Sequence, residues 1–300
     1  MRDFRSFVHS FVFTPPLSPD EVAALQRSDD PWESLAHLVH QASLGDFSEI
    51  ARVESLLRDT PQTLFWHVAS VFAGLAAPWD TLERIAASFD PAPAALQYPL
   101  SCMLAYACNP SFTERLLQLH EAATDDETRQ GVAWNLSFLL EPQNGLVWIG
   151  PRETDKYGDD EDDDDGGEEP DYANMSFAEL FAKKRDHAGY RVTVQQAVRA
   201  LPAAGVRDGD AVLEGAPLDA RQLARRIAER AGAGEDTRDR LVEEIVVLSA
   251  LTGVDFAPLL TRPGGLHPLD VCSAMETLLD DPALDALSSG QRHFMGHRVP

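Results

Sequence analysis

The sequence predicts an all-α fold in which helical hairpins stack in a row. Three observations predict it: a recurring helix-start pattern, apolar residues at helical spacing, and a 32-residue repeat in the first half of the chain. Extended patterns with β-branched residues are rare, and only Arg191–Val194 and Asp210–Leu213 suggest strands. With 300 residues and 44% hydrophobic content, the chain is long enough to bury a substantial core.

Four predicted helix starts consist of a capping residue followed by proline: Ser18-Pro19, Asp30-Pro31, Thr60-Pro61 and Asp90-Pro91. Proline suits the first turn of a helix, where an N–H has no intrahelical acceptor. Two further starts, Thr124–Glu127 and Ser176–Glu179, have the spacing of capping boxes. These positions therefore divide the chain into short helices.

The repeat is marked by three prolines 32 residues apart, Pro78, Pro110 and Pro142, each of which closes an apolar helix. Columns of similar residues precede them. Two columns contain small residues, Ala69, Ser101 and Ala133, then Ala73, Ala105 and Ser137; two are mainly large, Phe72, Leu104 and Leu136, then Leu75, Ala107 and Leu139. Small residues four apart let a neighbouring helix approach closely.

The helix after each turn also recurs, since Ile50, Val53 and Leu57 reappear as Leu82, Ile85 and Phe89. Each helix–turn–helix unit cannot bury its apolar face alone and must stack on its neighbours. The alternative is an ordinary helical bundle in which the proline spacing is chance.

We divide the chain into a helical half at 1–150, an acidic loop at 151–175 and a second helical half at 176–300. The loop contains GDDEDDDDGGEEPD, which has too little apolar surface to offset the entropy of ordering, so we expect it to be disordered. In the second half we expect helices near 176–187, 192–201, 219–232, 236–252 and 268–280. Among these, 236–252 has the widest apolar face and should be buried on most sides.

The formal net charge is -24, from 49 acidic and 25 basic residues, and Glu153–Asp171 carries -11 of it. This charge disfavours binding to nucleic acid or to an anionic membrane and favours a basic partner. The N-terminal segment is too interrupted by polar residues for a signal peptide or a membrane span. The three cysteines form no CxxC pair, which fits a reducing compartment, so we expect a cytoplasmic protein.

The repeats, together with Ala250–Asp255 (ALTGVD) and the terminal Gly290–Gly296 (GQRHFMG), resemble bacterial HEAT-like repeat proteins encoded beside secretion systems and polymorphic toxins. The resemblance covers about two thirds of the chain. It implies a HEAT-like α-solenoid and an immunity or adaptor protein that binds an effector. The acidic insertion departs from that family pattern.

Motifs typical of enzymes are missing: the sequence has no GxGxxG, GxxxxGK[ST], GxSxG or HExxH. We therefore expect neither an enzyme nor a cofactor. An EF-hand register fails in the acidic loop, because Gly166 at the sixth position puts Tyr172 at the chelating twelfth. A metal-dependent enzyme that uses this loop remains the second alternative.

Other candidate ligands have ordinary structural interpretations. The pairs His37 with His40 and His293 with His297 have helical spacing, but neither has a third ligand nearby in sequence, so we expect no metal site. Cys102 and Cys108 lie in packed columns and should be buried. A cluster of arginines should pair with local acids such as Glu229 and Asp239 or with the acidic loop; it comprises Arg221, Arg225, Arg226, Arg230, Arg238 and Arg240.

For partner binding we select Trp79 and Trp148, which fall at turns between helices, because tryptophan is favoured at interface hot spots. The alternative is that all five tryptophans pack internally. We also expect a basic partner to contact an acidic run, which consists of Asp159, Asp160, Glu161, Asp162, Asp163, Asp164 and Asp165. The sequence thus favours an acidic solenoid that neutralises a basic effector, such as a nuclease toxin; a general scaffold or adaptor is the first alternative.

Overall fold

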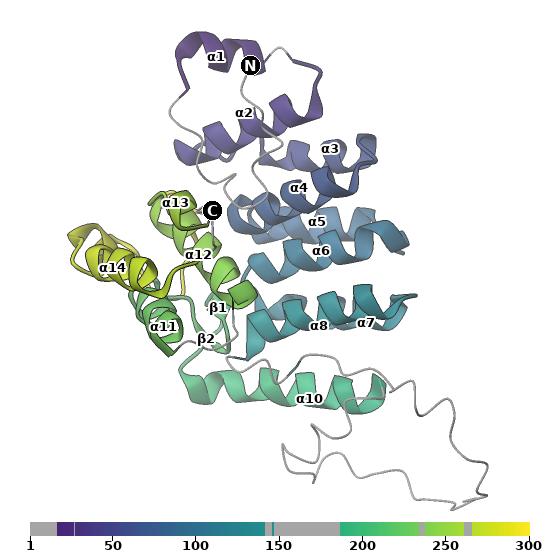
Figure 1. Cartoon of the computed structure of the whole chain (residues 1–300). Coiled ribbons are helices and arrows are strands. Elements are labelled where there is room, and N and C mark those ends of the chain that lie inside the picture. The colour runs from purple at the N-terminus through teal and green to yellow at the C-terminus, as the bar shows by residue number, and fades with distance from the viewer. Residues whose placement is uncertain (1–16, 27, 142–145, 147–186, 234–237, 261–265) are drawn as a thin grey trace, which may run out of the picture.

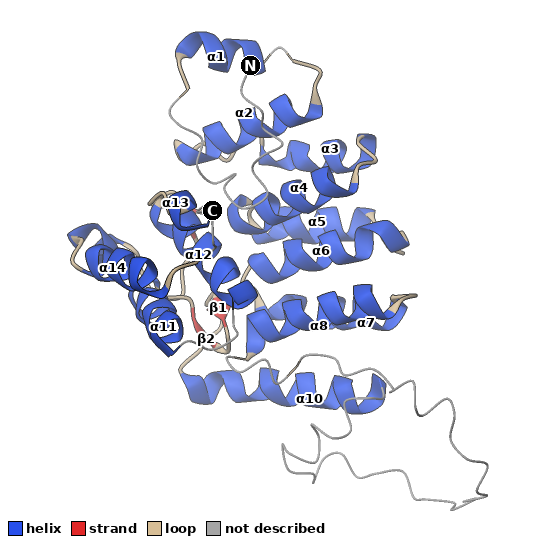
Figure 2. Ribbon diagram, viewed as in Figure 1, coloured by secondary structure: helices blue, strands red, loops and turns tan. Residues whose placement is uncertain are grey.

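The protein is mostly helical, as predicted. The computed structural model describes residues 17–26, 28–141, 146, 187–233, 238–260 and 266–300. Helices account for 71% of these residues, and the little strand present forms two short hairpins (Figure 2). The expected acidic loop at 151–175 and the expected helix at 176–187, apart from residue 187, lie outside the described residues.

The first half is a row of helices lying side by side (Figure 1). After α1 (Pro19–Leu25), the row consists of α2 (Pro31–Ser43), α4 (Thr63–Ala76), α6 (Ala94–Tyr106) and α8 (Asp126–Leu140). Shorter helices connect its members: α3 (Val53–Asp59), α5 (Trp79–Ser88) and α7 (Thr113–Ala122). The predicted prolines have the expected role, since Pro78 follows α4 and Pro110 follows α6; Pro142 lies outside the described residues.

The packed columns of the 32-residue repeat are confirmed. The two small columns are fully buried and the large ones nearly so, which places them between α4, α6 and α8. Close approach is most evident at Gly74 on α4, where a Cβ would lie 2.5 Å from the carbonyl oxygen of Met103 on α6. Small residues therefore set the spacing of the row.

Several predicted helix starts are confirmed by their caps. The Ser18 hydroxyl accepts from the Glu21 N–H in a capping box, and the Asp30 carboxylate accepts from the N–H groups of Trp32 and Glu33. Other starts differ by a few residues: α4 begins at Thr63, α6 begins at Ala94, and the cap of α8 is Asp125 in place of Thr124.

The second half contains α10 (His187–Ala200), α11 (Ala220–Ala233), α12 (Arg238–Thr252), α13 (Ala257–Leu260) and α14 (Pro268–Leu279). The predicted helices near 219–232, 236–252 and 268–280 are confirmed, and α12 is buried along most of its length as expected. The predicted helix at 192–201 begins earlier, so the strand expected at Arg191–Val194 is wrong: these residues belong to α10, whose Tyr190 and Val194 are fully buried.

Two β-hairpins follow the helices α10 and α14. In one, β1 (Val212–Leu213) pairs with β2 (Ala216–Pro217); in the other, β3 (His293–Phe294) pairs with β4 (His297–Arg298). The strand suggested by Asp210–Leu213 is thus confirmed. The helical spacing assumed for His293 and His297 is wrong, because a turn at Met295 and Gly296 puts them on opposite strands.

Each hairpin is the last part of a unit made of a helix, a 3-10 turn and the hairpin. This unit occurs twice, the second copy 81 residues after the first, and it was not predicted from the sequence. The helix starts at 187 and again at 268, a 3-10 turn follows at 201 and 282, and the strands start at 212 and 216, then at 293 and 297. Each two-residue turn has two consecutive positive φ angles, at Glu214 and Gly215 (51° and 73°) and at Met295 and Gly296 (52° and 80°). Positive φ at both central residues is the requirement of a type I′ turn.

The hairpins cap the C-terminal ends of the long helices. Backbone N–H groups of Glu214 and Gly215 donate to the carbonyls of Phe138 and Leu139 at the end of α8, at 3.0 and 3.1 Å. In the second copy, the N–H groups of the equivalent turn donate to two carbonyls at the end of α12, those of Ala250 and Leu251. The final carbonyls of a helix have no intrahelical donor, so each turn supplies what its helix lacks.

The two turn glycines provide a matched test of this capping. A Cβ at Gly215 would lie 2.6 Å from the carbonyl oxygen of Leu140, whereas a Cβ at Gly296 would meet nothing within 4 Å. Both substitutions place alanine at positive φ, which costs about 1 kcal/mol. We expect Gly215→Ala to lower the free energy of unfolding by at least about 1 kcal/mol more than Gly296→Ala, because its methyl group also displaces the cap. Urea unfolding of the two variants measures the difference. Equal losses of unfolding free energy would show that a methyl group at residue 215 does not disturb the cap of α8.

Candidate functional site

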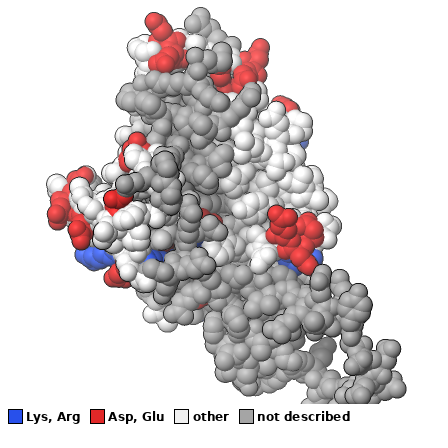
Figure 3. Space-filling model, in the orientation of Figure 1, with Lys and Arg blue, Asp and Glu red and all other residues white. Residues whose placement is uncertain are grey.

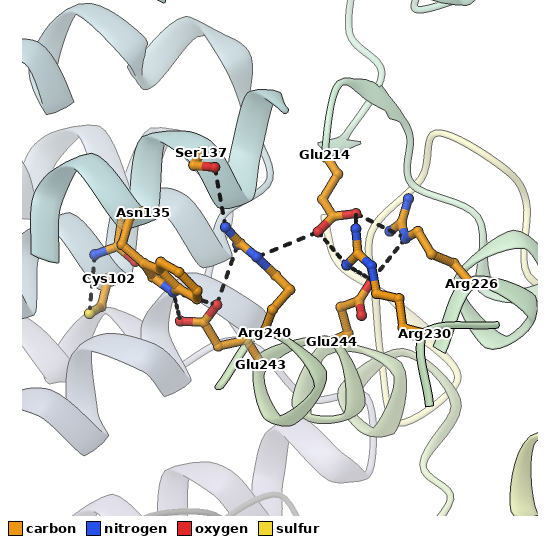
Figure 4. A network of polar contacts seen from close by, with 10 residues as sticks. Cys102, Asn135, Ser137, Glu214, Arg226, Arg230, Arg240, Glu243 and Glu244 are labelled. Carbon is orange, nitrogen blue, oxygen red and sulfur yellow. Dashed lines mark hydrogen bonds and ion pairs between the residues drawn. The ribbon is translucent and has the colours of Figure 1, made fainter. Parts of the chain in front are cut away.

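A buried cluster of carboxylates and guanidinium groups lies where the first hairpin and α11 and α12 meet α8 (Figure 4). Glu214 comes from the hairpin turn and Glu244 from α12, and both side chains are fully buried. Arg226 and Arg230 come from α11, one helical turn apart, and Arg240 from the start of α12. Spacing of four on α11 puts both of its guanidinium groups on the face that meets the two glutamates.

The ion pairs within the cluster are close. Arg230 lies 2.8 Å from a carboxylate oxygen of Glu214 and 2.8 Å from one of Glu244. Arg226 lies 3.0 Å from Glu214 and 2.8 Å from Glu244, so each α11 arginine bridges both carboxylates. Arg240 is further from Glu214, at 3.6 Å. The arginines thereby connect the hairpin to α12.

Arg240 extends the cluster to the row of helices. Its guanidinium lies 4.3 Å from the ring centroid of Trp134 and 5.0 Å from that of Phe138, and it donates to the Ser137 hydroxyl; all three residues are on α8. Glu243 accepts from the indole N–H of Trp134 at 2.8 Å and pairs with Arg240 at 3.4 Å. Cation–π contacts of this kind are strongest when water is excluded.

The cluster is electrically balanced, with Glu214, Glu243 and Glu244 against three arginines. Burial, followed by repulsion from Glu214, raises the pKa of the Glu244 carboxyl. Burial also lowers the pKa of Arg240, although the surrounding carboxylates oppose this effect. Buried charges persist only when they are paired, so this set behaves as one unit that holds α11 and α12 to α8.

A separate buried cation, Arg292 at the start of the second hairpin, joins that hairpin to α4. Its guanidinium donates to the carbonyls of Gly74 and Ala77 at the end of α4, the latter at 2.8 Å, and lies 5.9 Å from the ring centroid of Trp79. Burial lowers its pKa to about 10. A cation is well placed here, because the C-terminal end of a helix carries partial negative charge.

A third junction holds α10 to α7. His120 on α7 is buried and stacks on Tyr190 of α10, with ring centroids 4.3 Å apart, beside His187. Arg191 donates to the carboxylates of Glu114 and Glu121 across the same contact. Burial lowers the pKa of His120 to about 3, so the neutral imidazole is the form that the folded contact accepts.

The described residues hold no group of three histidine, cysteine or acidic side chains placed to bind a metal ion. His37 is buried in α2, and burial lowers its pKa. Cys102 and Cys108 are buried as predicted, and burial raises the pKa of each thiol to about 12, which keeps both protonated and unreactive at neutral pH.

The exposed surface of the described residues is acidic (Figure 3). Red acidic atoms gather over α1, over the turn between α7 and α8, and over α14. Exposed acids in these and other places include Asp29, Asp46, Asp59, Asp80, Glu83, Asp125, Asp126, Glu127, Asp255, Glu276, Asp280 and Asp285. Most described arginines, by contrast, lie within ion-pair distance of a carboxylate of the same chain: Arg52, Arg58, Arg115, Arg129, Arg191, Arg207, Arg221, Arg226, Arg230 and Arg240.

Of the residues selected for partner binding, only Trp79 is described. It is partly buried, and its indole N–H donates to the carbonyl of Ala107 at 2.9 Å, so it serves as a contact within the chain. Trp148 and the acidic run at 159–165 lie outside the described residues. The other tryptophans also have internal contacts: Trp32 packs edge-on against Phe65, and the Trp66 N–H donates to the Leu57 carbonyl.

The residues that sequence reasoning missed are the carboxylates of the buried cluster. The arginine cluster was identified, and pairing within the chain is confirmed for Arg221, Arg226, Arg230 and Arg240. Their partners are Glu214, Glu243, Glu244 and, for Arg221, Asp285. Spacing along the sequence could not select them, because Glu214 is brought in by the hairpin turn. The sequence feature that could have indicated Glu214 is its position directly before a glycine, as in a two-residue turn.

Comparison with known proteins gives no relative: no protein-family model, curated protein or solved structure matches this chain. Within the part of the chain that the structure describes, none of the helices combines the length and apolar character needed to cross a membrane.

We expect Glu214→Gln to lower the free energy of unfolding by about 3 kcal/mol, because it leaves buried guanidinium groups without one of their carboxylates. Glu49→Gln is the control, since it removes a carboxylate from an exposed pair with Arg52 and should cost less than about 1 kcal/mol. A double-mutant cycle with Arg230→Met measures the coupling, expected at about 1–3 kcal/mol. Equal effects of the two glutamine variants, or no coupling energy, would contradict the role of the cluster in holding α11 and α12 to α8.

We expect acid to destabilise the protein partly through His120. The folded-state pKa of about 3 lies below the ordinary value of 6.5, so the stabilisation is complete above pH 6.5 and is lost as the pH falls from 6.5 towards 3. His120→Phe keeps a stacking ring and should reduce the slope of unfolding free energy against pH by about 1.4 kcal/mol per pH unit in that window. Urea unfolding at several pH values measures it. His267→Gln, at an exposed histidine, is the control for removing an imidazole elsewhere. An unaltered slope in His120→Phe would refute the assignment.

Proposed function

We propose that this chain is a protein-binding α-solenoid of the HEAT-like type, and that it acts as an immunity protein that neutralises a basic effector. The observation that carries the proposal is the distribution of charge: most of the described arginines lie within ion-pair distance of a carboxylate of the same chain, while many of the described acids face solvent. A surface of this kind accelerates encounter with a positively charged protein and repels nucleic acid.

The helical row supports the same proposal. Helices that repeat and pack through small residues give an extended surface, and extended helical stacks bind partners along it without catalytic groups. The buried ionic clusters fix the second half on the row, so the binding surface is rigid before the partner arrives. A preformed surface avoids the entropic cost of ordering upon binding.

The experiment is affinity purification of the tagged full-length chain from its native host at low salt, followed by identification of the bound proteins. We expect one stoichiometric partner of net positive charge. Its affinity should fall about tenfold or more as the ionic strength rises from about 0.05 to about 0.5 M, because exposed charges are screened. Expression of this partner alone should arrest growth, and co-expression of the chain should restore it.

Two other outcomes of this experiment would contradict part of the proposal. Several unrelated partners with no toxicity would replace the immunity role with that of a general scaffold or adaptor. A neutral or acidic partner whose affinity does not change with salt would overturn the electrostatic basis of the proposal.

A further inference from the structure

A groove lies between the short helix α13 and α14. Both helices belong to the second half (Figure 1), and acidic atoms gather over α14 (Figure 3). Its volume is about 320 Å³. From α14 it is lined by Ala274, Thr277 and Leu278, which repeat at three and four residues and so share one face of that helix. The opposite wall is lined by Val254, Phe256, Pro258 and Leu259.

The walls of the groove carry one sign of charge. Asp255 and Asp281 line it directly. Sequence 253–260 contains one acid and no base, and sequence 268–290 contains five acids, Asp270, Glu276, Asp280, Asp281 and Asp285, and no base. Arg221 is the basic residue that the structure shows pairing with this set, through Asp285. An apolar floor between acidic rims suits an apolar side chain flanked by cations.

Both rim carboxylates are held in place by the backbone. One oxygen of Asp255 accepts from the Ala257 N–H at 2.9 Å, and one oxygen of Asp281 accepts from the Ala283 N–H at 2.8 Å. Each carboxylate is therefore positioned in the free protein. Positioned charges lose little entropy when a ligand binds.

We propose that this groove is the docking site for a basic, amphipathic segment of a protein partner, with an apolar side chain between α13 and α14 and Lys or Arg side chains on Asp255 and Asp281. The inference rests on the proposed function for the class of partner, and it goes further by naming the surface and the kind of segment that occupies it.

The test uses the full chain and a defined probe, a short fluorescent peptide with two leucines between pairs of lysines. We expect binding by fluorescence anisotropy, with methyl NMR shifts confined to Val254, Leu259, Ala274 and Leu278. A peptide with serine in place of leucine should not bind. Equal binding of the serine peptide, or shifts at other acidic surfaces, would overturn the proposal, because charge alone would then explain the association.

Variants of the rim and the floor sharpen the test. Asp255→Asn with Asp281→Asn keeps both capping oxygens and should weaken the peptide about fivefold, since each exposed ion pair contributes only modestly. Thr277→Phe, at an exposed position, should fill the groove and abolish binding. The matched control, Asp30→Asn with Asp125→Asn, removes two charges from helix caps elsewhere and should leave affinity unchanged. Circular dichroism and melting temperature check that each variant folds.

A further result would overturn the proposal. A native basic partner that binds the asparagine and Thr277→Phe variants as tightly as the wild type would exclude the groove while the proposed function stands. The failure to find any basic partner would instead remove the proposed function, whatever the peptide does.

Discussion

The structure depends on how the helix row satisfies its carbonyl ends. The C-terminal ends of α4, α6 and α8 are reached by groups from the second half: Arg292 caps α4, the Val212 N–H donates to the Cys108 carbonyl just beyond α6 at 2.7 Å, and the turn at Glu214 caps α8. A buried carbonyl without a donor costs about 1–3 kcal/mol. Each of these buried carbonyls has a donor from the second half, which joins the second half to the row at three helix ends. The hairpins are also bonded to each other, since the Ala211 N–H donates to the Gly290 carbonyl and the Gly290 N–H to the Leu218 carbonyl.

This arrangement also determines where the buried charges lie. The turn that caps α8 carries Glu214 into the interior, next to a helix end that is already negative. Its charge must be compensated there, and Arg226, Arg230 and Arg240 provide that compensation together with Glu244. With Glu243, the cluster holds three acids and three arginines, so it leaves the net charge of the rest of the chain at -24. The acidic surface is therefore independent of how the second half is attached to the first.

The sequence was sufficient to predict the helical class, the 32-residue packing columns and most helices, because side-chain size and period report directly on helix faces. It did not reveal the 81-residue unit, whose copies share backbone conformation more than side chains: Gly209 matches Gly290 and Gly215 matches Gly296, but Glu214 corresponds to Met295 and Ala211 to Arg292. The carboxylates of the buried cluster were missed because backbone conformation, not spacing along the sequence, brings Glu214 to α11. Trp79 was selected for its place at a turn, where sequence gives no sign that Ala107 offers a carbonyl.

Differences between the two copies of the helix–hairpin unit explain why a groove borders only the second copy among the described residues. On α10, Tyr190 and Arg191 fix the helix to α7, the first by stacking on His120 and the second by two carboxylate pairs. Their equivalents on α14 are Val271 and Cys272, which form no ion pair. α14 packs instead against α11, and the face of α14 that carries Ala274 and Thr277 borders the groove. In the described structure this face packs against the core through Ala274 and Leu278 and is open at Thr277, which is exposed, and Asp281 lines the groove beyond the end of α14. An acid is tolerated at such an open edge, whereas a buried and unpaired one would be costly.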